Sequence, residues 1–119
     1  MGQQLVTDQL AYDAVITPVL PVTGRPLGWY DMSSSNLDKY HDRLLEDMQF
    51  QVPFNMAGQP AISLPLCSTA SGLPLGVQFV GGIGDEALLL SLATQLEQAA
   101  PWRDRMVPPV ARRTGTAAH

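Results

Sequence analysis

The stretch FNMAGQPAISLPL, residues 54–66, combines a short apolar run with a glycine, two prolines and one asparagine. Its second half, AISLPL, predicts a strand, because the apolar run is bounded by turn-forming residues. Gly58 permits a backbone conformation that other residues resist, and Pro60 restricts the backbone just before the strand. Asn55 can bind loop amides through a side chain with both donors and acceptors. The stretch therefore predicts scaffold rather than reacting groups.

A second apolar run, LPLGVQFVGG at residues 73–82, predicts another strand, because glycines and a proline bound it on both sides. Neither run alternates cleanly between apolar and polar residues. Continuous apolar strands are typical of sheets that are covered on both faces. We therefore expect both strands in the interior of a layered α/β fold rather than in an open antiparallel sheet.

The sequence DEALLLSLATQLEQAAPW, residues 85–102, predicts a helix that covers such a sheet. Asp85 stands at the N-cap position, and Pro101 ends the helix. The wide apolar face consists of Leu88, Leu89, Leu92, Ala93, Leu96 and Ala100.

The upstream half predicts a strand, a connection and a second helix. Residues 14–20, AVITPVL, are rich in β-branched residues and predict a strand that ends near Thr17. Residues 22–35 hold turn formers at short intervals and predict an exposed connection. The apolar face of the helix that follows consists of Leu37, Tyr40, Leu44 and Met48.

The ends of this second helix are also predicted from the sequence. Ser35 with Asp38 resembles a capping box at its start. Pro53 ends the helix or its last turn, because the residue before a proline is disfavoured in the helical conformation. With only two good helices, three apolar strands remain incompletely covered, so part of the fold is expected to come from another polypeptide region.

Composition excludes several classes of protein. The chain has 119 residues, enough for one domain or part of one, and a net charge of -4. Without a broad basic field, we expect no nucleic acid partner and no anionic membrane surface as partner. A single cysteine and no Cys/His cluster with metal-ligand spacing suit the cytoplasm. No run approaches the length of a membrane span, and the N-terminus does not resemble a signal peptide.

Taken in order, the blocks YDAVITPVLP, FNMAGQPAISLPL, SGLPLGVQFVGG and DEALLLSLATQLEQAAPW resemble the C-terminal portion of amidase signature enzymes. The resemblance implies an α/β fold, namely part of an α/β/α layered fold with a mixed central sheet, incomplete in this chain. Residues 1–102 would be the C-terminal portion of an amidase-signature domain, and residues 103–119 an extended or flexible tail. The structural positions of the shared motifs are Gly58, Pro60, Pro65, Gly76, Gly81 and Asp85.

The resemblance implies hydrolysis of carboxamide C–N bonds, or amide transfer, by two serines and a lysine in the N-terminal half of the family. This chain does not match those positions. Its serine run, residues 33–35, lacks flanking glycines, and Lys39 follows the run instead of preceding it at a long interval. His41 and His119 have no recognisable partner for activating a serine. We therefore expect no catalytic residue and no amide hydrolysis by the chain alone.

The resemblance also places Phe54 and Asn55 near the family's substrate channel. The alternative is a buried phenylalanine and a hydrogen-bonded structural asparagine. In the long connection, Trp29 and Tyr30 either line the substrate entrance or pack back on the body of the protein.

The residues also suggest two other chemical hypotheses. Cys67 has no basic residue within eight positions, which favours inert packing over a nucleophilic role. The strand, turn and helix of residues 76–90 invite a phosphate cradle, but Asp85 and Glu86 put carboxylates where the phosphate would lie. We expect no metal and no cofactor.

The expected partner is the remainder of an amidase chain, or another protein that covers the sheet, with a small amide as the substrate of the complete enzyme. The alternative hypothesis is a non-catalytic interaction module. Self-association is possible in either case, because the uncovered sheet would expose apolar surface.

Overall fold

The computed structural model describes residues 6–7, 11–33 and 35–103. Along the chain, the elements are β1 (Val15–Pro18), α2 (Leu37–Met48), α3 (Val52–Ala57), β2 (Ala61–Ser68), β3 (Pro74–Val80) and α4 (Glu86–Ala99). The predicted tail lies outside the described residues, apart from Arg103. In the part that is described, no helix is both long enough and apolar enough to span a bilayer.

The three strands form one sheet in the order β1-β3-β2. Both neighbouring pairs are antiparallel, with Ile16 and Ile62 each opposite Phe79. The apolar runs argue against an open antiparallel sheet and leave the direction of the individual strands undetermined; these three strands are antiparallel within the layered fold. Their apolar composition reflects the helices on the two sides of the sheet, and composition alone does not encode strand direction.

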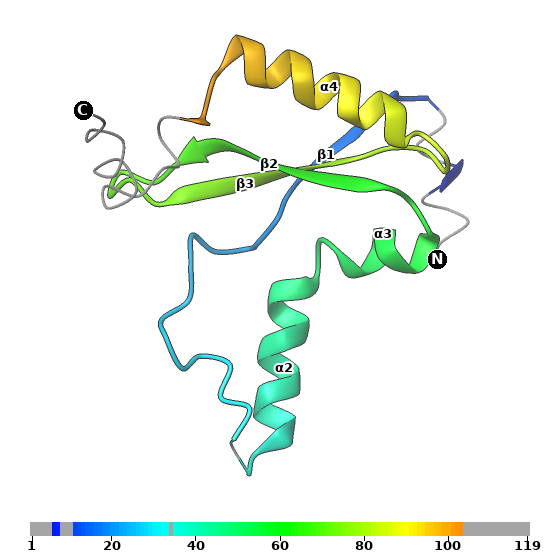
Figure 1. Ribbon diagram of the computed structural model, residues 1–119. Coiled ribbons are helices and arrows are strands. Elements are labelled where there is room, and N and C mark those ends of the chain that lie inside the picture. The colour runs from blue at the N-terminus through cyan, green and yellow to red at the C-terminus, as the bar shows by residue number, and fades with distance from the viewer. Residues whose placement is uncertain (1–5, 8–10, 34, 104–119) are drawn as a thin grey trace, which may run out of the picture.

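α4 covers one face of the sheet (Figure 1). Leu89 of α4 meets Leu64 of β2 and Phe79 of β3 in the buried core, and the three residues are at most 5% exposed. The partly buried residues packed against this core are Ala14, Ile62, Leu66, Val77, Leu92, Ala93, Leu96 and Trp102. α4 ends at Ala99, just before Pro101, as the sequence predicts.

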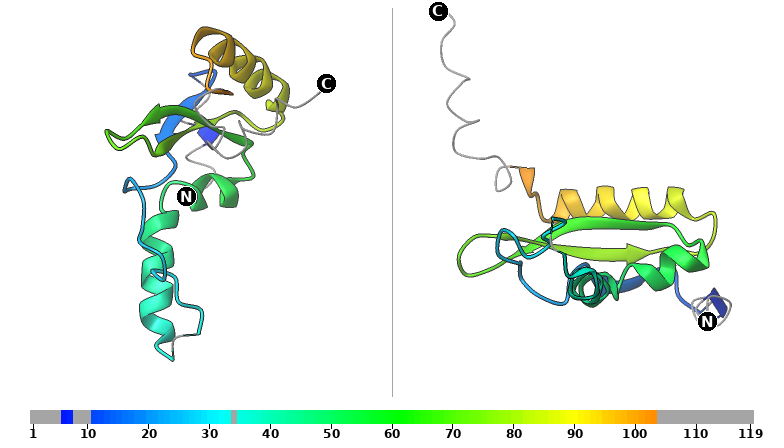
Figure 2. Two further views of the ribbon diagram at one scale, coloured as in Figure 1. Left: turned by 60° about the vertical axis from the view of Figure 1, so that its left-hand side comes forward. Right: turned by 90° about the horizontal axis from the view of Figure 1, so that it is seen from below.

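The opposite face carries α3 and the end of α2, as the view from below shows (Figure 2). Gln78 of β3 is buried and donates from Nε2 to the Phe50 carbonyl at 3.0 Å and to Thr17 Oγ1 at 3.1 Å. Gln51 donates to the Val19 carbonyl at the same junction. These bonds attach the chain after α2 to the sheet, while the rest of α2 extends away from it (Figure 1).

The start of α2 differs from the prediction. Asn36, and not Ser35, is the N-cap residue, because its side-chain oxygen accepts from the Lys39 amide at 3.0 Å. On the predicted apolar face, Leu37 is 70% exposed, while the charged Asp47 is the buried residue of the helix.

The end of α2 differs as well. The helix ends at Met48, and Pro53 lies in the first turn of a new helix, α3. Proline is tolerated there because the first amides of a helix have no intrahelical acceptor. Phe54 and Asn55 are therefore helical residues rather than loop residues, and Asn55 is exposed.

Prolines occupy both edge strands. β2 has a register shift between Leu64 and Cys67, and Pro65 lies in this bulge. The amide of Gly81 donates to the Pro60 carbonyl at 2.9 Å, so the backbone groups of Pro60 point toward β3. Backbone groups of successive residues point alternately toward and away from the neighbouring strand, and the nitrogen of Pro65 therefore points away from β3. The registers direct the nitrogen of Pro18 in β1 away from β3 too. Neither proline therefore removes a bond from the ladder.

Candidate functional site

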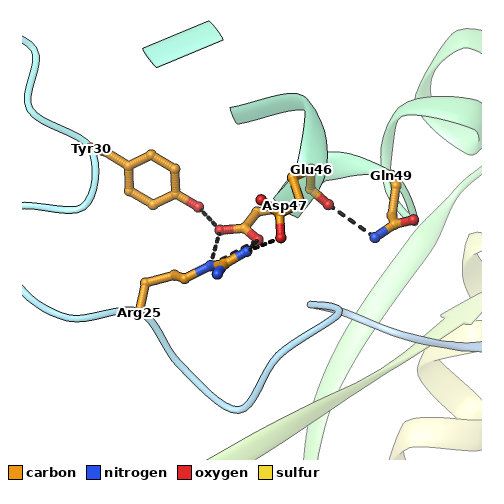
Figure 3. Close-up of polar contacts among 5 residues, drawn as sticks. All are labelled: Arg25, Tyr30, Glu46, Asp47 and Gln49. Carbon is orange, nitrogen blue, oxygen red and sulfur yellow. Dashed lines mark hydrogen bonds and ion pairs between the residues drawn. The ribbon is translucent and has the colours of Figure 1, made fainter. Parts of the chain in front are cut away.

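The connection before α2 is attached to that helix by a cluster of charged and aromatic side chains. Arg25 donates from Nε to both carboxylate oxygens of Asp47, at 3.1 and 2.9 Å, and from a terminal nitrogen to Asp47 Oδ1 at 2.6 Å. The same guanidinium reaches Glu46 at 2.6 Å. Tyr30 donates its hydroxyl proton to Asp47 Oδ2 (Figure 3). We call Arg25, Tyr30, Glu46 and Asp47 the Arg25 cluster.

The Arg25 cluster changes the proton affinity of its members. The hydrogen bond from Arg25, and then that from Tyr30, lower the pKa of Asp47 below its ordinary value. The bond to Asp47 raises the pKa of Tyr30. Asp47 is only 2% exposed, so its charge depends on these donors rather than on water.

Trp29 lies between two guanidinium groups. Arg25 is 4.4 Å and Arg43 is 4.0 Å from the centroid of its ring, within the range of cation–π attraction. Arg43 also donates to the Trp29 carbonyl at 2.7 Å. The indole Nε1 is buried and has no hydrogen-bond partner among the described residues.

A small polar hollow opens beside Trp29, between the connection and the N-terminal half of α2. Its volume is about 160 Å³. Lys39 and Arg43 bring two positive charges to its lining, and Asp31 brings one negative charge. The described residues that line it are Gly28, Trp29, Asp31, Asn36, Lys39, Tyr40 and Arg43. Below, we call it the Trp29 hollow.

The structure separates the residues predicted for a substrate channel. Trp29 contacts α2 through Arg43, whereas Phe54 and Asn55 lie on α3, beside the sheet (Figure 1). Neither Phe54 nor Asn55 lines the Trp29 hollow. Phe54 is half-buried, and its carbonyl accepts from the Gln59 amide at 3.1 Å. If the three residues border one channel, other parts of a larger protein must join their two locations.

The motif positions take several conformations. Gly58 ends α3 with a φ of 71°, in the left-handed region that favours glycine. Asp85 occupies the N-cap position of α4, but its side chain makes no capping hydrogen bond. A side chain on Gly81 would press on Leu89 at 3.2 Å, so the turn and α4 approach closely at this point.

Cys67 is exposed, which contradicts the packing expected for it. It borders an apolar hollow of about 460 Å³ on the α4 side of the sheet. Ile16 of β1 lines the same hollow and is 64% exposed. α4 packs on β2 and leaves this part of the sheet open. Within the described ranges, no group of three His, Cys, Asp or Glu side chains could hold a metal ion.

Sequence reasoning missed the Arg25 cluster, because it depends on contacts between residues 22 positions apart. One signal was available. Asn36, Lys39, Arg43 and Asp47 recur at helical spacing and form a polar stripe on α2. This stripe faces the connection.

Comparison with known proteins places the chain in a family. The family model described as Amidase matches residues 3–90. The chain is 55% identical over 58 residues to the 6-aminohexanoate-cyclic-dimer hydrolase of Paenarthrobacter ureafaciens, covering 49% of this chain and 12% of that protein. It is 39% identical over 93 residues to a glutamyl-tRNA(Gln) amidotransferase subunit of Clostridium botulinum, covering 78% and 18%. The chain belongs to the amidase family.

A solved structure supports the same assignment and confirms the α/β fold class. The structure of 6-aminohexanoate cyclic dimer hydrolase complexed with substrate matches with a TM-score of 0.64 and 32% identity, over 92% of this chain and 24% of that chain. The described sheet and helices therefore correspond to part of an amidase fold. The chain spans less than a quarter of the length of each of these three relatives.

Proposed function

We propose that the chain acts as the C-terminal segment of an enzyme that hydrolyses carboxamide C–N bonds. In this role it supplies three strands, a covering helix and part of the substrate channel, but no catalytic group. The observation that carries the proposal is the open apolar surface along β1. Ile16 and Leu20 are exposed beside the apolar hollow, where a complete layered fold would place a further element.

The family of the relatives supports amide hydrolysis as the reaction of the complete enzyme. One relative is named as a 6-aminohexanoate-cyclic-dimer hydrolase, and the other as a subunit of a glutamyl-tRNA(Gln) amidotransferase. The serines and the lysine that the resemblance implies would come from the remainder of the protein. The single cysteine, which favours a reducing compartment, supports the cytoplasm as the proposed location.

Complementation tests this proposal. The Paenarthrobacter hydrolase would be truncated before the region that matches this chain and expressed with or without residues 1–119. Hydrolysis of the cyclic dimer is expected only from the pair, and the chain alone should release no product. Ile16→Glu should abolish restoration, because it places a charge in the apolar hollow. Leu27→Glu is the matched control, since Leu27 is fully exposed elsewhere.

Three results would count against the proposal. Hydrolysis by the chain alone would show that it carries its own catalytic group. Equal restoration by the Ile16 and Leu27 variants would show that β1 is not the contact surface. No restoration by the wild-type chain, although both chains are folded and soluble, would favour the non-catalytic interaction module.

The channel residues have their own test in the complete enzyme. Asn55→Ala should lower turnover without reducing the amount of folded protein, because the Asn55 side chain is exposed and makes no hydrogen bond to other residues that the structure describes. Turnover and the thermal unfolding midpoint would be measured on the same preparation. A parallel loss of folded protein would assign Asn55 a structural role instead.

A further inference from the structure

The sheet carries a groove on its α4 side, along β1. A hollow of about 430 Å³ lies between the flank of α4 and the residues before β1, and the apolar hollow of about 460 Å³ includes Ile16. Side chains two apart along an extended chain share a face, so Ala14, Ile16 and Pro18 point the same way. Ala14 packs against the core under α4. The two hollows therefore lie on one face, and we call them together the β1 groove.

The helix α4 is too narrow to cover the whole face. Neighbouring strands lie about 4.8 Å apart, and a helix with its side chains is about 10–12 Å wide, so one helix covers about two strands. α4 uses this width on β2 and β3, where Leu89 meets Leu64 and Phe79. β1 lies on the other side of β3. The β1 groove is therefore the place that a second helix beside α4 would occupy.

A further strand beside β1 would extend the sheet without filling the groove, and the edge of β1 supports such pairing poorly. β1 has only four residues. Its register with β3 directs the backbone groups of Val15 and Thr17 inward, so only those of Ile16 and Pro18 point outward. Proline has no amide hydrogen, which leaves the Ile16 amide as the single outward donor of the strand. A helix over the face is therefore favoured over a strand at the edge.

The lining of the β1 groove matches the apolar stripe of an amphipathic helix. Ile16 is 64% exposed and Leu20 is 41% exposed, although both side chains are large and apolar. Leu92 adds apolar surface from α4, and Gln95 of the same helix is exposed. Asp13 is the only charged residue among the described residues of the lining. A helix that is apolar toward the sheet and polar toward water fits this pattern.

From these observations we infer that the β1 groove holds an amphipathic helix from the remainder of the amidase, packed beside α4. The inference rests on the proposed function, because it names the element that this segment receives from the rest of the enzyme. Such an enzyme has enough chain to supply the helix, since the solved hydrolase matches this chain over only 24% of its length. Packed helices lie about 8–10 Å apart, which brings the new helix against Leu88 and Leu92 as well as Ile16.

Photo-crosslinking of the full chain tests this inference. Benzophenone maleimide would be attached to Cys67, the only cysteine of the sequence, which is exposed in the groove. A second labelled chain carries Gln95→Cys together with Cys67→Ser. Each would be irradiated with the truncated Paenarthrobacter hydrolase, and mass spectrometry would identify the crosslinked residues. We expect both labels to reach one segment of the hydrolase, at residues three or four positions apart, as on one face of a helix.

Thr94→Cys in the Cys67→Ser chain is the matched control. Thr94 is exposed on α4 next to Gln95 but lines neither hollow of the groove. The yield of its crosslinks to the same segment should be several-fold lower than the yield from position 95. Equal yields from the two positions would mean that the label does not report on the groove, and the inference would fall.

Other results would overturn the inference as well. Crosslinks at alternate residues would identify a strand, and crosslinks to the chain itself or to a second copy would identify a different occupant. Crosslinking no stronger than that of the control would show that no helix lies in the groove. If hydrolysis is restored in that mixture, the proposed function stands without the helix. Loss of both hydrolysis and crosslinks counts against the two proposals together.

Discussion

Gly76 lies in the central strand, where a side chain would collide with two neighbours. A Cβ at this position would be 2.8 Å from Ser63 Oγ and 2.8 Å from Val19 Cγ2. Gly76→Ala should therefore lower the free energy of unfolding by about 1–3 kcal/mol, as overpacking does. Urea denaturation would measure the change. Adding Ser63→Ala to the same chain should restore part of the lost stability. If it restores none, the collision with Val19 alone accounts for the loss.

Asn36 caps α2, whereas the neighbouring Ser35 does not. Because the Asn36 side chain satisfies the Lys39 amide, Asn36→Ala should cost about 1 kcal/mol. Ser35→Ala serves as the control and should change stability by less than about 0.5 kcal/mol. Both variants would be compared by thermal unfolding monitored by circular dichroism at 222 nm. A larger loss of stability in Ser35→Ala than in Asn36→Ala would show that Ser35 is the cap.

At the scale of elements, the Arg25 cluster decides whether the connection stays on α2. The pKa of Asp47 is lowered in the folded chain, so the stabilisation is complete above its ordinary value of 3.8 and is lost as the pH falls through the lowered value. Arg25 and Tyr30 donate to Asp47, and Arg25 also donates to the neighbouring Glu46. We expect the connection to leave α2 in acid before the sheet unfolds.

The indole signal of Trp29 would follow this detachment, and amide signals of β3 would report on the sheet. In Asp47→Asn, the Trp29 signal should already resemble the acid form at neutral pH. The control is Asp38→Asn, because Asp38 is exposed on the same helix and takes no part in the cluster. If wild type and Asp47→Asn titrate identically, Asp47 does not hold the connection.

Local patterns predicted most of the elements. The β-branched run at residues 14–20 and the apolar face of residues 85–101 specify a strand and a helix without distant contacts. α3 was missed, because six residues are too few for a periodic pattern and Pro53 is compatible with either the end or the start of a helix. Strand direction and the burial of Asp47 were missed because both depend on residues far away in the sequence.

The whole molecule leaves much apolar surface in contact with water. Exposed large side chains occur on all layers, including Ile16 on β1, Leu45 on α2 and Leu90 on α4. The isolated chain is therefore expected to self-associate at micromolar concentration. Sedimentation velocity over a dilution series would measure this. Ile16→Glu should shift the distribution toward monomer more than Leu27→Glu does, and a strictly monomeric wild type would contradict the expectation.

The two edge prolines, Pro18 and Pro65, limit the kind of aggregate that self-association can produce. Amyloid stacking needs an uninterrupted row of amide donors along the strand that receives the next copy. Pro18 and Pro65 each interrupt that row on the outward side of β1 and β2. Aggregates of this chain should therefore be amorphous and stain weakly with thioflavin T, while Pro65→Val should make fibrils easier to nucleate.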